Sequence, residues 1–334
     1  MKTHPPKNYL VLGRINSIAE PVGATQRRGG RGETQRFCTP KIFHPTVSVG
    51  IFHFLCESLR TLRLRVEFLL LPTALLRFSL TAAALCWPAV LPAADLEHAK
   101  DGSGVYGYKD TPKLPWCAWL VHDPDRPAPA RIDPGKAGPP APVPADAVVL
   151  FDGKDAAKWR ALGDWKVADG CLVSGNGVLT TKDSYGDMQL HVEWMAPAHF
   201  EGPWYNRGNN GVMLMGLFEI QIFDSFNEKI YPDGQCGAIY GQTPPLVNVT
   251  RPPGEWQSYD IVFTAPKFAG DKLTAPARVT VFHNGVLVQL NEEIHGEIGH
   301  RILPEYKQKI SRGPLAFGGH GCPVRFRNVW LRPL

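Results

Sequence analysis

One stretch of the sequence, FEIQIFDS, carries the side chains best suited to acid and base chemistry. In an extended strand Glu219 and Gln221 share one face, because side chains alternate along a strand. Asp224 points to the other face unless one bulged residue, at Ile222 or Phe223, turns it back. Two carboxylates on one face can divide the roles of acid and of base or nucleophile. The alternative is structural: Glu219 is then a buried ion-pair partner, and Asp224 starts a turn.

His320 is the candidate catalytic imidazole among the 11 histidines. It stands in Gly-Gly-His-Gly, and flanking glycines allow the backbone to approach a ligand closely. The alternative is a loop histidine that only caps a neighbouring group.

Short strands must position these residues. From residue 148 onward, short alternating runs are broken by Gly, Pro and Asn, a pattern typical of a β-sandwich or jelly roll. Leu190, Val192 and Trp194 alternate with polar residues, which indicates a strand with one buried face. Asn284-Gly285 predicts a hairpin, because both central residues of a type I′ turn need positive φ.

Two further features describe the strands and their surroundings. The last apolar run, residues 323–331, changes phase near Arg327 and Asn328, as a bulged strand does. Residues 95–144 are expected to form a polar and Pro-rich strap or linker, because 124–144 are so rich in Pro that they cannot pair as a central strand. The folded domain is therefore expected to span residues 145–334.

The N-terminal region has the features of a secretory signal within residues 66–94. An apolar run of 14 residues, 78–91, follows Arg77 and is too short for a membrane span of about 20 residues. Small residues at Ala93 and Ala94 predict cleavage there. We expect a periplasmic or secreted bacterial protein that is not held in the membrane once the signal is removed.

Residues 1–65 precede this signal and are expected to be a non-native, disordered extension from an upstream start codon. The mature chain is expected to begin near Asp95. Several arginines lie before that point, so the net charge of +5 does not indicate a nucleic-acid partner. Four cysteines follow it, and an even number in an oxidising compartment favours one disulfide among Cys117, Cys171, Cys236 and Cys322.

Eight motifs, in order and without large gaps, resemble the bacterial 3-keto-disaccharide hydrolase family. They are LFDGK (150–154), WKVADG (165–170), GNNG (208–211), FEIQIFDS (218–225), GAIYG (237–241), PGEW (253–256), PARVTVFHNGVLVQ (276–289) and PVRFRN (323–328). The chain departs from the family where Gln-Asp-His-Gly is expected before the last strand. Here Gly318-Gly319-His320-Gly321 lacks the carboxylate, which puts any role of that group in doubt.

The resemblance implies an all-β fold, a concanavalin/LamG-like β-jelly-roll sandwich of two antiparallel sheets. It implies an enzyme acting on glycosides or disaccharides whose sugar a partner dehydrogenase has oxidised at C3. Family members act as hydrolases or lyases, sometimes with a divalent metal. We expect no organic cofactor, and neither a metal nor its ligands can be named from the sequence.

Five residues are candidates for binding the sugar: Arg207, Asn210, Gln221, Tyr240 and Trp256. GNNG first indicates a turn, since Gly and Asn tolerate positive φ, although Asn210 could also bond sugar hydroxyls. Aromatic rings stack on sugars, but sandwiches also bury many aromatics in their cores.

For a 3-keto sugar the cleavage chemistry is distinctive. The ketone acidifies the proton at C2, so a base forms an enolate and the C1 oxygen departs by elimination. Glu219, Asp224 and His320 could share these acid and base roles. The rival hypotheses are a conventional retaining glycoside hydrolase of jelly-roll type and a non-catalytic, lectin-like carbohydrate-binding module.

Overall fold

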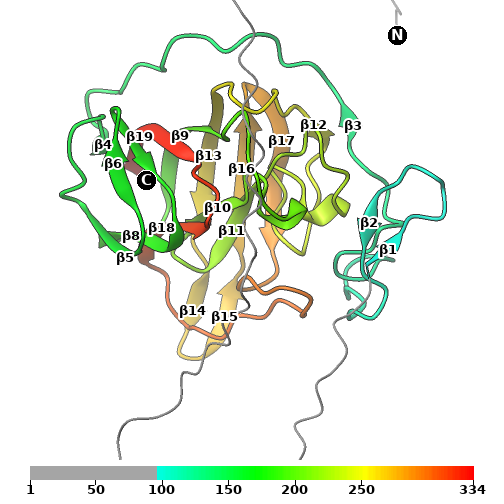
Figure 1. The fold of residues 1–334 in the computed structure, drawn as a ribbon. Helices are drawn as coiled ribbons and strands as arrows, with labels where there is room; N and C mark the ends of the chain where they lie inside the picture. The colour runs from blue at the N-terminus through cyan, green and yellow to red at the C-terminus, as the bar shows by residue number, and fades with distance from the viewer. Residues whose placement is uncertain (1–95) are drawn as a thin grey trace, which may run out of the picture. The chain divides into compact units, whose positions relative to one another are not determined.

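Two antiparallel sheets form the body of the domain in the computed structural model (Figure 1). The structure describes residues 96–334, apart from the side chains of Ala161 and Leu162. The signal expected at 66–94 and the extension expected at 1–65 lie outside the described residues. In the described part no α-helix occurs, and no helix is long and apolar enough to cross a membrane.

The smaller sheet has five strands. In spatial order they are β11 (Phe218–Ile222), β10 (Asn210–Leu214), β18 (Gly313–His320), β8 (Asn176–Tyr185) and β5 (Trp159–Gly163). All neighbouring strands are antiparallel.

The larger sheet has eight strands, all paired antiparallel. In spatial order the main path is β17 (Val286–Ile294), β16 (Ala277–His283), β13 (Gln257–Thr264), β9 (Met188–Met195), β19 (Arg325–Pro333), β7 (Cys171–Val173) and β6 (Lys166–Ala168). The eighth strand, β4 (Val148–Phe151), also pairs with β19.

Short elements complete the described chain. They are the strand pairs β1 (Glu97–His98) with β2 (Tyr106–Gly107), β3 (Ala130–Arg131) with β12 (Val247–Asn248) and β14 (Lys267–Ala269) with β15 (Lys272–Ala275), and the 3-10 turns η1 (Trp204–Asn206) and η2 (Pro232–Gly234).

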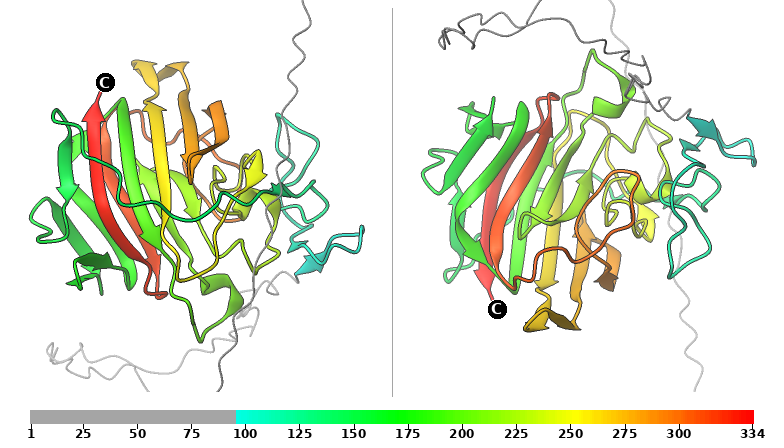
Figure 2. Two further views of the ribbon diagram at one scale, coloured as in Figure 1. Left: turned by 90° about the horizontal axis from the view of Figure 1, so that it is seen from above. Right: turned by 90° about the horizontal axis from the view of Figure 1, so that it is seen from below.

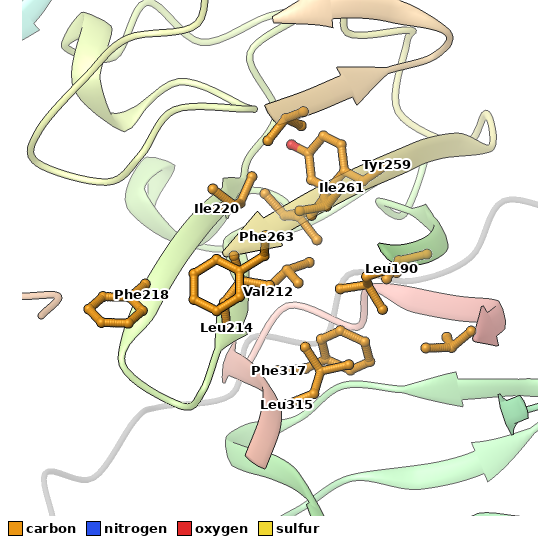
Figure 3. Close-up of a cluster of buried hydrophobic side chains, with 14 of the residues drawn as sticks. Leu190, Val212, Leu214, Phe218, Ile220, Tyr259, Ile261, Phe263, Leu315 and Phe317 are labelled. Atoms are coloured by element: carbon orange, nitrogen blue, oxygen red, sulfur yellow. The ribbon is translucent and has the colours of Figure 1, made fainter. Parts of the chain in front are cut away.

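The core lies between the two sheets. Ile220 and Phe317 come from the five-stranded sheet, and Leu190, Ile261 and Phe263 come from the eight-stranded sheet (Figure 3). These side chains are buried because one face of every strand turns inward and apolar residues occupy it. The jelly-roll sandwich expected from the sequence is confirmed.

The local sequence signals are confirmed as well. Leu190 and Trp194 face the core from β9, as the alternation predicts. Asn284 and Gly285 join β16 to β17 with φ of 53° and 79°. The register of β19 against β9 shifts between Arg327 and Trp330, which is the predicted bulge.

The Pro-rich segment lies along the outer face of the eight-stranded sheet (Figure 2, left). The backbone N–H of Ala141 donates to the carboxylate of Glu193 at 3.0 Å, and the amide of Asn328 donates to the carbonyl of Ala141 at 2.9 Å. Arg251 donates to the carbonyl of Gly135 at 2.8 Å. These bonds attach the segment to strands β9 and β19 and to the loop before β13.

Candidate functional site

A pocket of about 300 Å³ opens beside the five-stranded sheet. Its aromatic lining consists of Tyr108, Trp204, Tyr205, Phe223, Tyr231 and Tyr240. Its polar lining includes Asn209, Gln221, His300 and His320. Aromatic walls with a few polar groups suit a ring-shaped ligand that carries hydroxyls.

Strands β10, β11 and β18 bring Gln221 and His320 to this pocket. Gly211 is paired with Gln221 on one side and with Gly318 on the other, so these three positions share one face of the sheet. His320 lies two residues beyond Gly318 and therefore on that face too. The two glycines contribute no side chain of their own to this face next to Gln221.

Glu219 occupies the same face, two residues before Gln221. A Cβ added at Gly211 would collide with its Oε1, so the carboxyl group folds over that glycine. Burial raises the pKa of Glu219 from its usual 4.5 to about 8. No residue of the described chain donates a hydrogen bond to this carboxyl group or forms an ion pair with it. At neutral pH Glu219 is therefore a protonated acid, and the expectation of an ion-pair partner is wrong.

Tyr240 is held between two polar neighbours in the pocket. Its hydroxyl lies 3.0 Å from the hydroxyl of Tyr231 and 2.8 Å from Nδ1 of His300. Burial, followed by repulsion from His122, lowers the pKa of His300 to about 4. Burial also lowers the pKa of His320 below its usual 6.5. Both imidazoles are thus neutral at neutral pH, the form that can accept a proton.

Asp224 does not join Glu219. Strand β11 ends at Ile222 without the predicted bulge, and the carboxylate of Asp224 accepts hydrogen bonds from Arg207 at 3.2 Å and from the Asn227 side chain at 3.1 Å. It also accepts from the backbone N–H of Asn227 at 3.2 Å, as a turn-initiating Asp does. Asp224 thus starts a turn, and Arg207 forms ion pairs with it and with Glu228.

Two other predicted binding residues lie away from the pocket lining. Asn210 is fully buried, and its side-chain oxygen accepts from the backbone N–H of Gly211 at 3.0 Å. Trp256 lies under the guanidinium of Arg327, 3.8 Å from the ring centre, and faces a separate cavity beneath the Pro-rich segment. Of the sequence candidates, the pocket lining contains Gln221, Tyr240 and His320.

Three residues that line the pocket were not predicted from the sequence: His300, Tyr231 and Tyr108. None stands in a recognisable motif, and each comes from a loop or a short turn. The one available signal was the GAIYG motif. It marked Tyr240, and His300, Tyr231 and Tyr108 line the same pocket as Tyr240.

The predicted disulfide is absent from the described residues, where Cys117, Cys171, Cys236 and Cys322 are all free. The thiol of Cys236 lies 2.9 Å from the hydroxyl of Tyr259, and that of Cys322 accepts from the N–H of Gly208 at 3.2 Å. Both thiols are core groups with their own partners.

The residues of the described chain do not form a metal site by themselves. No three His, Cys, Asp or Glu side chains there lie close enough to hold a metal ion. His300 and His320 line the pocket without a carboxylate beside them, whereas a divalent metal site usually combines such groups. No step is therefore assigned to a metal.

The chain is similar to a known protein family and to solved structures. Residues 146–332 match the 3-keto-alpha-glucoside-1,2-lyase-like domain. A crystal structure of a provisionally named glycosyl hydrolase from Parabacteroides distasonis is 37% identical, covers 60% of this chain and 94% of that protein, and has a TM-score of 0.55. A second provisionally named glycosyl hydrolase from this organism is 23% identical, covers 56% and 99%, and has a TM-score of 0.42.

A search among curated proteins gave no match. The family match nevertheless spans more than half of the 334 residues and covers the strands of both sheets, apart from Pro333 at the end of β19. The chain belongs to the 3-keto-alpha-glucoside-1,2-lyase-like family of carbohydrate-active proteins.

Proposed function

We propose that this protein cleaves the glycosidic bond of 3-keto-glycosides by elimination. The observation that carries the proposal is the combination in one aromatic pocket of two neutral imidazoles, His300 and His320, and a hydrogen-bonded phenol, Tyr240. Elimination needs a base, a hydrogen-bond donor for the enolate and an acid for the leaving group. The pocket and its immediate surroundings supply all three.

The proposed reaction is balanced without water. One imidazole, His300 or His320, removes the proton at C2, and the electron pair passes into the C3 ketone to give an enolate. The enolate then forms the C1–C2 double bond as the bond between C1 and the glycosidic oxygen breaks. A proton from an acid neutralises the leaving oxygen, so the products are an unsaturated 3-keto sugar and an alcohol.

Tyr240 and Glu219 suit the two donor roles. Burial raises the pKa of Tyr240 far above 10, so its hydroxyl keeps its proton and can donate to the enolate oxygen. Glu219 is protonated below about pH 8 and lies on the same strand face as the pocket residue Gln221. These properties support Glu219 as the acid for the leaving group.

The retaining-hydrolase alternative has less support. It requires two carboxyl groups about 5–5.5 Å apart, one of them ionised as a nucleophile. No Asp or Glu is among the described residues that line the pocket, and Asp224 is bonded to Arg207 and Asn227. The elimination route avoids this requirement.

We also propose an enzymatic source for the 3-keto substrate and a cellular compartment for the reaction. A sugar 3-dehydrogenase would supply the ketone, because the elimination depends on an oxidised C3. We further propose that the protein acts in the periplasm or outside the cell, which the apolar segment before Ala93 and Ala94 supports. Intact-mass analysis of protein recovered from that compartment tests this placement.

The test of the reaction compares a 3-keto-glucoside with its parent glucoside. We expect cleavage of the keto compound alone, since only the ketone acidifies C2. In D₂O, substrate recovered before completion should carry deuterium at C2, because the enolate can be reprotonated from exchangeable hydrogen. Equal cleavage of the parent glucoside without label would support a retaining hydrolase, and tight binding without turnover would support a lectin-like module.

A further inference from the structure

Residues 105–126 precede the family match, which begins at residue 146, yet they form part of the pocket. Tyr108 lines it directly. Tyr106 packs edge-on against the pocket residue Trp204, with ring centres 4.5 Å apart. Both tyrosines pack on the small apolar cluster that contains Phe223 and Tyr231. One wall of the pocket is therefore built from a segment that the family domain does not include.

The same segment inserts a buried imidazole behind the pocket. His122 and Asp233 are both fully buried, and the backbone N–H of His122 donates to Oδ2 of Asp233 at 2.9 Å. Nδ1 of His122 lies 3.2 Å from Oδ1 of the same carboxylate. Although burial opposes it, the pairing with His122 lowers the pKa of Asp233. A charged carboxylate thus fixes the orientation of the imidazole.

The fixed imidazole packs against the residues assigned to the chemistry. Its ring centre lies 4.0 Å from that of Tyr231, 4.9 Å from Tyr240 and 5.1 Å from His300. Its Nε2 is buried and has no hydrogen-bond partner within the described residues. A buried polar atom without a partner is costly, so stability alone does not explain an imidazole at this position.

A second contact attaches the segment to the loop that carries His300. Arg301 forms an ion pair with Asp110 at 2.6 Å, and its guanidinium lies 4.6 Å from the ring centre of Tyr108. Tyr108 in turn meets His300 edge-on, with ring centres 5.6 Å apart. The segment therefore contacts the His300 loop through two residues, Tyr108 and Asp110.

We propose that residues 105–126 complete the active site, with His122 as the positioning residue that fixes the Tyr240–His300 pair and Tyr108 as the wall that contacts the sugar. The proposal rests on the proposed function, because it assigns a role in that reaction. It extends that function by making activity depend on a segment outside the family domain.

His122→Asn in the full chain is the first test. His122 has φ of 59°, which Asn tolerates better than other replacements, so the turn should persist. We expect kcat for the 3-keto-glucoside to fall about tenfold to a hundredfold, because the pair loses its support. His199→Asn, an exposed change outside residues 105–126, is the matched control and should keep normal kcat.

The second readout needs no turnover. Tyr108, His122, Asp233, Tyr240 and Arg301 are the titratable and charged groups that face His300. In His122→Asn the NMR titration midpoint of His300 should rise above that of the wild-type protein, since burial and repulsion both decrease. An unchanged midpoint together with unchanged kcat in a folded variant overturns the proposal.

Asp110→Asn guards against misfolding of the buried variant. It removes only the exposed partner of Arg301 and should lower kcat severalfold while leaving Tm within a few degrees, because an exposed ion pair contributes little stability. Asp169→Asn removes an exposed Arg325 pair at 2.9 Å outside the pocket lining and should change neither quantity. Equal kcat in the two variants counts against the proposal.

The two proposals fail in different ways. If the wild-type protein does not cleave the 3-keto-glucoside, the proposed function fails, whereas the His300 titration still tests whether His122 acts on it. If the wild-type protein cleaves the compound but His122→Asn changes neither kcat nor the titration, only the positioning role of His122 fails.

Discussion

The outer face of the eight-stranded sheet stabilises the charged forms of its buried ionisable groups, whereas the pocket beside the five-stranded sheet favours the neutral forms. On the outer face, Glu193 accepts hydrogen bonds from Arg327 at 2.7 Å, from Asn328 at 2.8 Å and from the N–H of Ala141 at 3.0 Å. Although burial opposes it, bonding to His191 and these donors lowers the pKa of Glu193 to about 2. Its charge is fully compensated.

His191, on the same face, is also held in its charged form by its neighbours. Although burial lowers it, hydrogen bonds to Asp260 and Glu193 raise the pKa of His191 to about 9. In the pocket region, by contrast, the pKa shifts of Glu219, His300 and His320 all favour the neutral forms. A carboxylic acid and imidazoles kept neutral at neutral pH can exchange protons with a substrate, whereas the paired charges on the outer face cannot do so without breaking their network.

The largest expected effect concerns the pocket imidazoles. His300→Gln and His320→Gln remove the candidate bases, so at least one variant should lower kcat/KM for the 3-keto-glucoside by 10²- to 10⁴-fold. Tm should stay within a few degrees, because neither imidazole is part of the core cluster. The exposed His199→Gln serves as the control. Full activity in both pocket variants would show that neither His300 nor His320 is the base.

Glu193→Gln should produce the reverse pattern. It leaves Arg327 and His191 beside a neutral amide, and breaking such a buried network costs about 3 kcal/mol of unfolding free energy. Activity per folded molecule should be unchanged. Urea denaturation with the exposed Glu255→Gln as control measures the difference. A large loss of kcat at unchanged stability would place chemistry on the outer face.

A pH dependence of stability is expected at Glu219. Its folded pKa of about 8 exceeds the usual 4.5, so this contribution to stability is present below pH 4.5 and is lost as pH rises through 8. Glu219→Gln has no such titration. The Tm advantage of the variant over wild type should therefore be smallest near pH 4, grow between pH 4.5 and 8 and reach about ten degrees at pH 9, since one pKa unit corresponds to about 1.4 kcal/mol. A constant difference across this range would contradict the raised pKa.

Much of the fold was predictable because its signals are local. The alternation of Leu190, Val192 and Trp194 identified a strand face, and Asn284-Gly285 identified a hairpin from the φ angles that its turn requires. The family motifs extended these local signals to the whole sandwich. Strand alternation and flanking glycines, which are sequence properties, also singled out Gln221 and His320, and both line the pocket.

The composition of the site was decided by tertiary contacts. The sequence could not show that Arg207 would donate a hydrogen bond to Asp224. Nor could it show that Asp110 would form an ion pair with Arg301, 191 residues away. Such pairings depend on how loops cross the ends of the sheets, and loop residues follow no periodic pattern that would reveal their neighbours. The sequence by itself determined the strands, the hairpin and the sandwich. Only the packing of its loops decided that neutral imidazoles and tyrosines, rather than two carboxylates, line the pocket.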